Sequence, residues 1–175
     1  MKNFSYDKGP VGVGEPILEA LLNSSINTLV SINLSANKLW FEENDSSVSS
    51  VELLIEAIGM QSGLEHLIFD QNSLSQNVTQ KVLTKIADSS VCNSIKSLTM
   101  SGSFGDGANF DSDISVEKLA HIIQQAPALA KLDISGQLGF SRKIKVKVMY
   151  AYADAFGEVD QDGMGAIIIK DRNTK

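Results

Sequence analysis

Three groups of residues in this sequence have side chains that could carry chemistry. The first is an acidic run with the spacing that opens an EF-hand calcium loop, made of Glu158, Asp160, Asp162 and Gly163. The twelfth position of such a loop needs a glutamate that binds calcium through both oxygens, and Ile169 stands there. The run therefore indicates an acidic turn rather than a calcium site.

The second group consists of glycine-flanked segments that lack the rest of the motifs they suggest. Gly9, Gly12 and Gly14 follow no strand pattern, and no Gly-Lys-Ser/Thr comes after them, so they do not form a phosphate loop. Ser103 directly follows a glycine, whereas a nucleophile elbow has the spacing Gly-x-Ser-x-Gly. We expect an irregular lead-in over residues 1–14 and a long surface loop over residues 101–113.

The third group holds the single cysteine and the two histidines. Cys92 cannot form a disulfide within the chain, and neither His66 nor His121 is recognisably paired with it, so we expect a small buried side chain. No third ligand accompanies the histidines in a zinc pattern. The acidic residues leading up to Asp113 are expected to cap a helix. The sequence thus predicts no catalytic residue, no metal site and no cofactor.

Charge and hydropathy narrow the range of partners. The formal net charge is −6, which argues against non-specific binding to nucleic acid or anionic membranes because both need a cationic surface. The basic stretch from Arg142 to Lys147 is expected to be the solvated face of an element. No run approaches the ~20 apolar residues of a membrane helix, and the N-terminus lacks the apolar region of a signal peptide. We expect a cytoplasmic protein that contacts neither nucleic acid nor membrane.

An internal repeat is the strongest signal in the sequence. Residues 29–39 have the spacing Leu-x-x-Leu-x-Leu-x-x-Asn-x-Leu, and residues 64–74 have it again, with Ile or Phe at one apolar position of each copy. Less complete copies begin at Ile95, Leu129 and Met164, so the copies start 35, 31, 34 and 35 residues apart. Such a sustained period predicts a stack of repeats, in which each copy supplies one strand.

The segments between these copies have apolar residues at helical spacing. Ser49 followed by Glu52 predicts the N-terminal cap of the second helix, and Asp113 or Ser115 predicts the cap of the fourth. The apolar stripes are Ile17, Leu18, Leu21 and Leu22; Val51, Leu54, Ile55 and Ile58; Val78, Val82, Leu83 and Ile86; and Val116, Leu119, Ile122 and Ile123. Alternation of strand and helix favours a parallel sheet with right-handed crossovers.

The last connector has two possible structures. Residues 143–150 alternate between charged and apolar side chains like a strand, which would give a C-terminal hairpin. A helix instead places Ile144, Val148, Tyr152 and Ala155 on one face and keeps the fifth copy of the motif in phase. We expect the helix, with the hairpin as the alternative.

The repeat resembles the leucine-rich-repeat family, and its long period with helical connectors is most similar to the ribonuclease-inhibitor-like branch. The resemblance covers residues 15–172 of a single domain spanning residues 1–175. It implies an α/β fold, a right-handed solenoid with about five parallel strands on the concave face and helices on the convex face. It also implies that Asn37 and Asn72 bind backbone groups where the chain leaves each strand, although later copies lack this asparagine.

The candidate site is the surface that such a fold leaves free. In each strand the residues between the apolar positions point away from the core. Trp40 and Phe41 lie in the loop after the first of these strands, and Phe104 lies in the corresponding loop of the third. Large aromatic side chains outside a core pattern are typical interface anchors. The alternative is that Trp40 and Phe41 fold back over the first repeat. The candidate protein-binding residues are Asn33, Ser35, Trp40, Phe41, His66, Ile68, Asp70, Thr99, Ser101, Phe104, Lys131, Asp133 and Ile168.

These observations favour a protein-protein interaction module that binds a partner through its concave face and adjacent loops. The resemblance implies one mode of action, the occlusion of a partner enzyme's active site. Stand-alone repeats of this composition are also similar to bacterial effectors delivered into a host cell without a Sec signal. The alternative is a structural or self-associating subunit, a monomer or an end-to-end dimer, that stacks through an uncapped C-terminal end.

Overall fold

The computed structural model describes residues 2–5, 29–36, 48–72, 74–102, 113–134, 148 and 150. Five strands of this described part form one parallel sheet, in which neighbours along the chain are neighbours in the sheet. They are β1 (Lys2–Ser5), β2 (Leu29–Asn33), β3 (His66–Ile68), β4 (Ser97–Thr99) and β5 (Lys131–Asp133). The sheet order β1-β2-β3-β4-β5 is the order that a stack of repeats requires.

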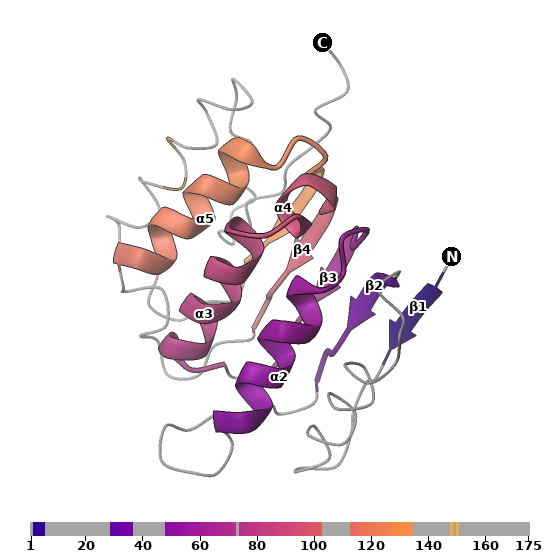
Figure 1. Cartoon of the computed structure of the whole chain (residues 1–175). Coiled ribbons are helices and arrows are strands. Elements are labelled where there is room, and N and C mark those ends of the chain that lie inside the picture. The colour runs from indigo at the N-terminus through magenta and orange to yellow at the C-terminus, as the bar shows by residue number, and fades with distance from the viewer. Residues whose placement is uncertain are drawn as a thin grey trace.

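The helices connect successive strands. They are α2 (Val48–Gly59), α3 (Gln76–Ala87), the single-turn α4 (Val91–Ser94) and α5 (Asp113–Gln125). Figure 1 shows α2, α3 and α5 side by side along one side of the sheet, with the short α4 leading into β4. The chain is therefore a mixed α/β protein with a parallel sheet, as the repeat predicted.

Strand register keeps the repeats in phase. Ile32 lies opposite Leu67, Leu67 opposite Leu98, and Leu98 opposite Leu132. The structure thus confirms the strands predicted around these four residues. The strand predicted around Ile167 lies outside the described residues.

One strand was not predicted. We expected residues 1–14 to be irregular, but Lys2–Ser5 form β1 and pair in parallel with β2. The segment is too short to show a periodic apolar pattern, and its one large apolar residue, Phe4, lies opposite Ile32 and packs against the core. We therefore attribute the strand to pairing with the edge of β2 and to packing of Phe4, and not to the intrinsic strand propensity of this segment.

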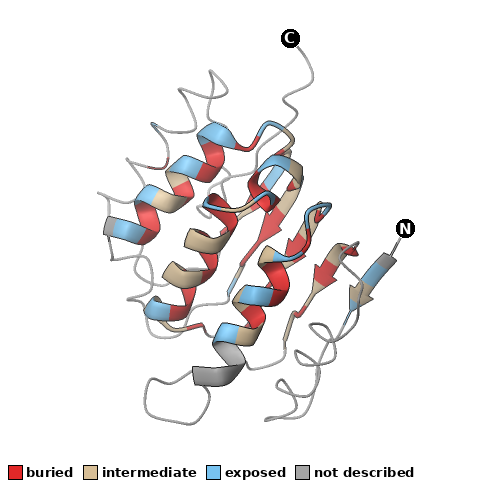
Figure 2. Cartoon of the chain, viewed as in Figure 1, coloured by how far each residue is buried: buried red, intermediate tan, exposed pale blue. Residues whose placement is uncertain are grey.

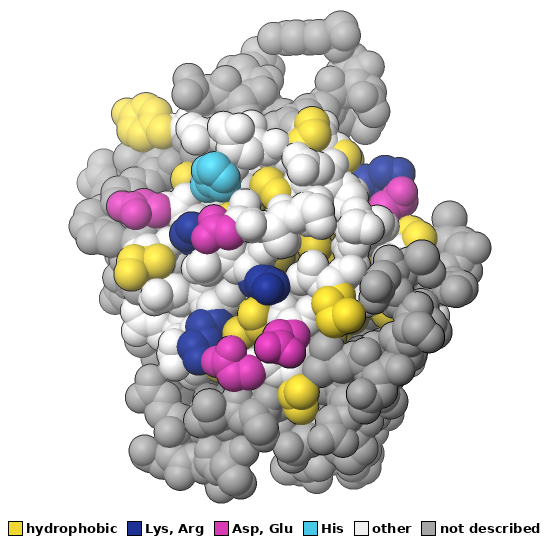
Figure 3. All heavy atoms as spheres, viewed as in Figure 1, with side chains coloured by type: hydrophobic (Ala, Val, Ile, Leu, Met, Phe, Trp, Pro, Cys, Tyr) yellow, Lys and Arg dark blue, Asp and Glu magenta, His cyan; other side chains and the backbone are white. Residues whose placement is uncertain are grey.

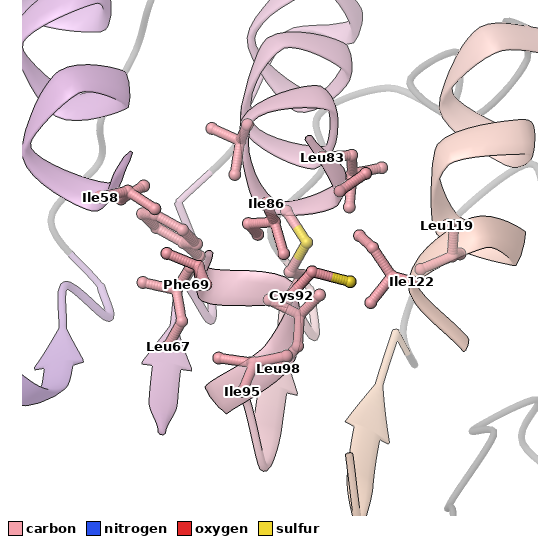
Figure 4. Packing of buried hydrophobic residues seen from close by; sticks show 14 of the residues in the cluster. Ile58, Leu67, Phe69, Leu83, Ile86, Cys92, Ile95, Leu98, Leu119 and Ile122 are labelled. Carbon is pink, nitrogen blue, oxygen red and sulfur yellow. The ribbon is translucent and has the colours of Figure 1, made fainter. Parts of the chain in front are cut away.

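The core lies between the strands and the helices. All apolar positions of the motif in β2 to β5 are buried, from Leu29 at 5% exposure to Leu132 at 0%. Figure 2 shows the buried side of each helix turned toward the strands. Figure 4 shows where they meet, with Ile58 of α2, Leu83 and Ile86 of α3 and Leu119 of α5 around the strand residues. Strands and helices thus bury one continuous apolar cluster.

The described helices follow the predicted stripes, with differences at their first residues. Val78, Val82, Leu83 and Ile86 of α3 are all buried, as are Val116, Leu119, Ile122 and Ile123 of α5. Ser75 caps α3 by accepting a hydrogen bond from the Val78 N–H at 3.3 Å. Helix α2 already begins at Val48 and α5 at Asp113, so Ser49, Asp113 and Ser115 lie inside helices and are not their caps.

The chain leaves successive strands through the same turn. Ala36, Gln71 and Gly102 each lie two residues after the last core residue of their motif, and all three have positive φ, at 56°, 59° and 55°. Asn72 follows Gln71 and is fully buried. Its side-chain amide donates to the Leu34 carbonyl of the preceding repeat at 2.6 Å and to the Phe69 carbonyl at 3.0 Å. This is the backbone-binding role that the resemblance implied for Asn72, whereas Asn37 lies outside the described residues.

Two further expectations concern the end of the chain and the membrane. Val148 and Tyr150, in the last connector, are helical, and Val148 is buried, so the helical alternative holds at these positions. The remainder of that connector is outside the described residues. Within the part of the chain that the structure describes, none of the helices has the length and hydropathy to cross a membrane.

Candidate protein-binding face

The candidate site lies on the side of the sheet that carries the residues between the core positions, which we call the sheet face. Register places these residues in rows across the strands. The first row contains Asn3, Ser31, His66, Ser97 and Lys131, and the second contains Ser5, Asn33, Ile68, Thr99 and Asp133. Strands of a sheet are ~4.8 Å apart, so neighbours in a row can contact the same ligand.

A shorter third row continues past the strand ends. The Ala36 N–H donates to the Asp70 carbonyl at 2.8 Å, and the Gln71 N–H donates to the Ser101 carbonyl at 2.9 Å. These bonds extend the parallel pairing and bring Ser35, Asp70 and Ser101 next to one another. The sheet face thus gathers nine of the predicted site residues: Asn33, Ser35, His66, Ile68, Asp70, Thr99, Ser101, Lys131 and Asp133.

Eight of these nine residues are half-buried or exposed, as a contact surface requires, and Lys131 is exposed. Thr99 is the exception. It was predicted to face a partner, but it is 3% exposed and therefore buried. Ile68 on β3 and Asp133 on β5 flank it in the register, and its hydroxyl donates a hydrogen bond to the Asp70 carboxylate. Thr99 is thus a support for the sheet face and not a contact residue.

Hydrogen bonds within the sheet face fix several of its polar groups. The Asp70 carboxylate accepts from the Ser101 N–H at 2.8 Å and from the Thr99 hydroxyl at 3.2 Å. The Asn33 side-chain oxygen accepts from the Ser35 N–H at 3.0 Å and from the Ser35 hydroxyl at 2.7 Å. These side chains are held in place before any ligand arrives, which lowers the entropic cost of binding through them.

Charged residues lie just before β3 and β4 and are paired with each other. Lys96 and Glu65 approach to 2.9 Å, and the His66 Nε2 atom lies 3.9 Å from the same glutamate. The His66 side chain is nevertheless 43% exposed, so it stays accessible on the sheet face. Lys96 and Glu65 therefore neutralise each other at this edge of the sheet face.

The helix side of the molecule has a different character. Lys81 of α3 contacts Glu52 of α2 at 2.6 Å, and Lys118 of α5 contacts Asp88, just after α3, at 2.8 Å. Figure 3 shows this side, where cationic and acidic side chains lie close to one another among neutral atoms. These pairs link consecutive repeats, and they leave charges of both signs mixed on this side.

The residues weighed for chemistry do not form a reactive site in the described part of the chain. Burial raises the pKa of the Cys92 thiol, and the nearby Asp88 carboxylate raises it further. Because the thiolate is the nucleophile, this environment makes Cys92 a packing residue. Figure 4 shows its sulfur directed toward Ile122. Among the described residues no group of three or more histidine, cysteine or acidic side chains is placed to hold a metal ion.

The remaining predicted site residues are Trp40, Phe41, Phe104 and Ile168, and all of them lie outside the described residues. Sequence reasoning also missed two residues of the sheet face. Asn3 and Ser5 of β1 are exposed and lie opposite Ser31 and Asn33. Their only signal was the alternation of Asn3, Phe4 and Ser5, which matches the polar-apolar-polar order of the facing residues in β2.

Comparison with known proteins supports the fold class. No protein-family model and no curated protein matches the chain. Among solved structures it is similar to the tropomodulin C-terminal domain of Caenorhabditis elegans, with a TM-score of 0.59 and 16% sequence identity. The likeness covers 90% of this chain and 85% of the other. At this identity it shows a shared leucine-rich-repeat-like fold, while activity and partners need separate arguments.

Proposed function

We propose that this protein is a binding module that recognises another protein through its sheet face. The observation that carries the proposal is the register, which assembles residues from five consecutive strands on one surface. Several of their polar groups are fixed by internal hydrogen bonds, and Ile68 adds a half-buried apolar group near the middle. A broad, preorganised surface of this kind suits a folded partner, which contacts a wide area, better than a small molecule, which is enclosed by a pocket.

The area of the sheet face limits what it can do alone. Five strands at ~4.8 Å spacing span ~19 Å, and the longest strand of five residues extends ~17 Å, which gives at most ~320 Å². A standard interface buries about 800 Å² on each partner. The loops that leave the strands must supply the difference, and Trp40 and Phe41 are the residues we assign to this role.

We further propose the finer features that the repeat implies. The stack is a right-handed solenoid with the sheet face concave, of the ribonuclease-inhibitor-like type, and it acts by covering the active site of a partner enzyme and not by catalysis. A cytoplasmic location, in the producing cell or in a host reached without a Sec signal, agrees with the single cysteine, which we find buried. The net charge of −6 supports a partner with a basic surface over nucleic acid or anionic membrane.

Affinity measurements on variants test the binding surface once a partner has been captured from host and source lysates. We expect Ile68→Ala and Trp40→Ala each to weaken binding at least about tenfold in calorimetry, because buried apolar anchors dominate interface energies. Glu117→Ala on α5 is the control, since Glu117 is exposed on the helix side. Lys118 is unsuitable as a control because it bonds to Asp88.

Each variant is first compared with the parent by circular dichroism to confirm that it folds. The proposal is wrong if the Ile68→Ala and Trp40→Ala variants both bind like the parent while Glu117→Ala loses affinity. That outcome would place the binding surface on the helices. The alternative of end-to-end self-association predicts a concentration-dependent mass in light scattering and no heterologous partner.

A further inference from the structure

Asp70 occupies a central place on the sheet face. It lies just after β3, the middle strand of the five, and two residues beyond Ile68 on the same side. Each of its carboxylate oxygens accepts one hydrogen bond, Oδ1 from the Ser101 N–H and Oδ2 from the Thr99 hydroxyl. An ionised carboxylate has about four acceptor positions, so roughly half of the acceptor capacity of Asp70 is still available. The two bonds hold the plane of the carboxylate in a fixed orientation.

The negative charge of Asp70 is not balanced by a cation in the described part of the chain. Three other acids there have a lysine partner: Glu52 contacts Lys81, Glu65 contacts Lys96, and Asp88 contacts Lys118. Asp70 is bound by neutral donors from the next repeat instead. The Asp70 side chain is half-buried, and its two bonding partners, a backbone N–H and a hydroxyl, are neutral. Its negative charge is therefore available to a positive group of a ligand.

We propose that Asp70 is the electrostatic anchor of the sheet face and that it binds an arginine side chain presented by the partner protein. This inference rests on the proposed function and names the chemistry of the partner. A guanidinium group can give two parallel hydrogen bonds to a carboxylate whose plane is already fixed, whereas a lysine ammonium is a point charge that gains less from a fixed plane.

The surroundings of Asp70 favour arginine for a second reason. Ile68 lies beside Asp70 on the sheet face and is half-buried, so it offers an apolar surface to the methylene stem of a long cationic side chain. Guanidinium is also more weakly hydrated than ammonium, so its desolvation costs less free energy when it contacts a partly buried carboxylate. The partner therefore presents an arginine whose stem crosses Ile68 and whose head reaches Asp70.

Asp70→Asn isolates the charge from the shape. The asparagine oxygen can still accept from the Ser101 N–H, and the Thr99 hydroxyl can turn to accept from the new amide, so the fold is retained. Glu117→Gln, at an exposed position of α5, changes the net charge by the same amount and is the matched control. Circular dichroism and urea unfolding of both variants verify that any loss of binding is not a loss of structure.

Peptide selection with the wild-type chain provides the probe. A displayed library of random twelve-residue peptides is selected on the wild-type protein, and the enriched peptides are synthesised and measured by calorimetry. We expect enriched peptides to contain an arginine whose replacement by citrulline weakens binding at least about tenfold. Asp70→Asn should produce the same loss, citrulline and Asp70→Asn together should add nothing further, and Glu117→Gln should bind normally.

The inference is overturned if the enriched peptides lack arginine, if they bind Asp70→Asn as tightly as the wild type, or if no peptide is enriched on the wild type. Replacing the arginine by lysine separates guanidinium recognition from general attraction to a cation, since equal affinity would refute the planar contact. Failure here is distinct from failure of the proposed function. A captured partner that needs Ile68 and Trp40 but not Asp70 would leave the binding face in place and remove only the anchor.

Discussion

Replacement of Asn72 by alanine removes a buried side-chain hydrogen bond that joins one repeat to the one before it. Asn72 has no solvent exposure, and its amide group donates to the Leu34 and Phe69 carbonyls at 2.6 and 3.0 Å. Alanine has no hydrogen-bond donor in its side chain, and the space left around it is enclosed by protein. The Asn72→Ala chain must therefore bury carbonyl oxygens that have lost these bonds, or open the turn to water.

The cost follows from these contacts. Loss of one hydrogen bond to a buried polar group costs about 1–3 kcal/mol, so loss of the two Asn72 bonds predicts a fall of about 2–6 kcal/mol in the free energy of unfolding. Natural domains have total stabilities of about 5–15 kcal/mol. The variant should thus fold with a much lower urea midpoint, or fail to fold if the parent is at the lower end of this range.

Urea unfolding followed by circular dichroism measures the difference, with linear extrapolation to water. Asn77→Ala is the matched control because Asn77 is exposed on α3, where alanine favours the helix, so its stability should stay within ~0.5 kcal/mol of the parent. A result in which Asn72→Ala unfolds at the parental midpoint would show that the carbonyls do not depend on this amide. Equal losses in Asn72→Ala and Asn77→Ala would likewise refute the reasoning.

Four other outcomes are expected. Leu67→Ala and Leu132→Ala should each lower the free energy of unfolding by ~2–5 kcal/mol in the same assay, because both leucines are fully buried. Ser97→Ala should change it by less than ~0.5 kcal/mol. The reverse ranking would mean that the two sides of the sheet are misassigned. Thr79→Val should raise the free energy of unfolding by about 1 kcal/mol, because the Thr79 hydroxyl is buried without a hydrogen-bond partner in the described part of the chain. Thr84→Val, on the less buried side of α3, should leave it unchanged. Burial raises the pKa of Cys92, so the folded chain keeps the thiol proton at a pH where the unfolded chain loses it. The free energy of unfolding should therefore fall more steeply with rising alkaline pH in the parent than in Cys92→Ala. Iodoacetamide should label the thiol of the native protein slowly. Excess calcium should not shift the melting temperature; a rise of several degrees would show that an acidic loop binds the ion.

The sequence was sufficient to predict the repeating part of the fold. Apolar residues at motif positions such as Leu64, Leu98 and Ile134 are all buried, because a strand or helix that recurs in phase has one face it must bury. Strand β1 and helix α4 could not be predicted in this way. Each spans four residues, which is too short for a period to appear, and contacts with neighbouring repeats order them.

The sequence indicated on which side of the sheet the candidate residues lie, but it did not indicate how exposed each of them is. Alternation correctly assigned His66, Ile68 and Asp70 to one side of the sheet. It could not show that Thr99 would be buried, because that depends on the size of its cross-strand neighbours and on its bond to Asp70. Gln61 shows the same limit, since its buried side chain accepts from the Leu29 N–H, a contact 32 residues away that no local pattern contains.

Contacts between the described repeats run mainly between neighbours in the chain. Helix α3 packs between α2 and α5, each strand pairs with the next, and ion pairs and the Asn72 amide join adjacent turns of the stack. In such an arrangement each repeat is stabilised mainly by its contacts with the repeats next to it. Opening then begins at an edge, so amide hydrogens of β1 should exchange with solvent well before those of β3 and β4. We therefore expect the middle of the sheet face to be the most persistent part of the described sheet, so that a partner that depends on β3 would still find its binding surface while the edge strand opens.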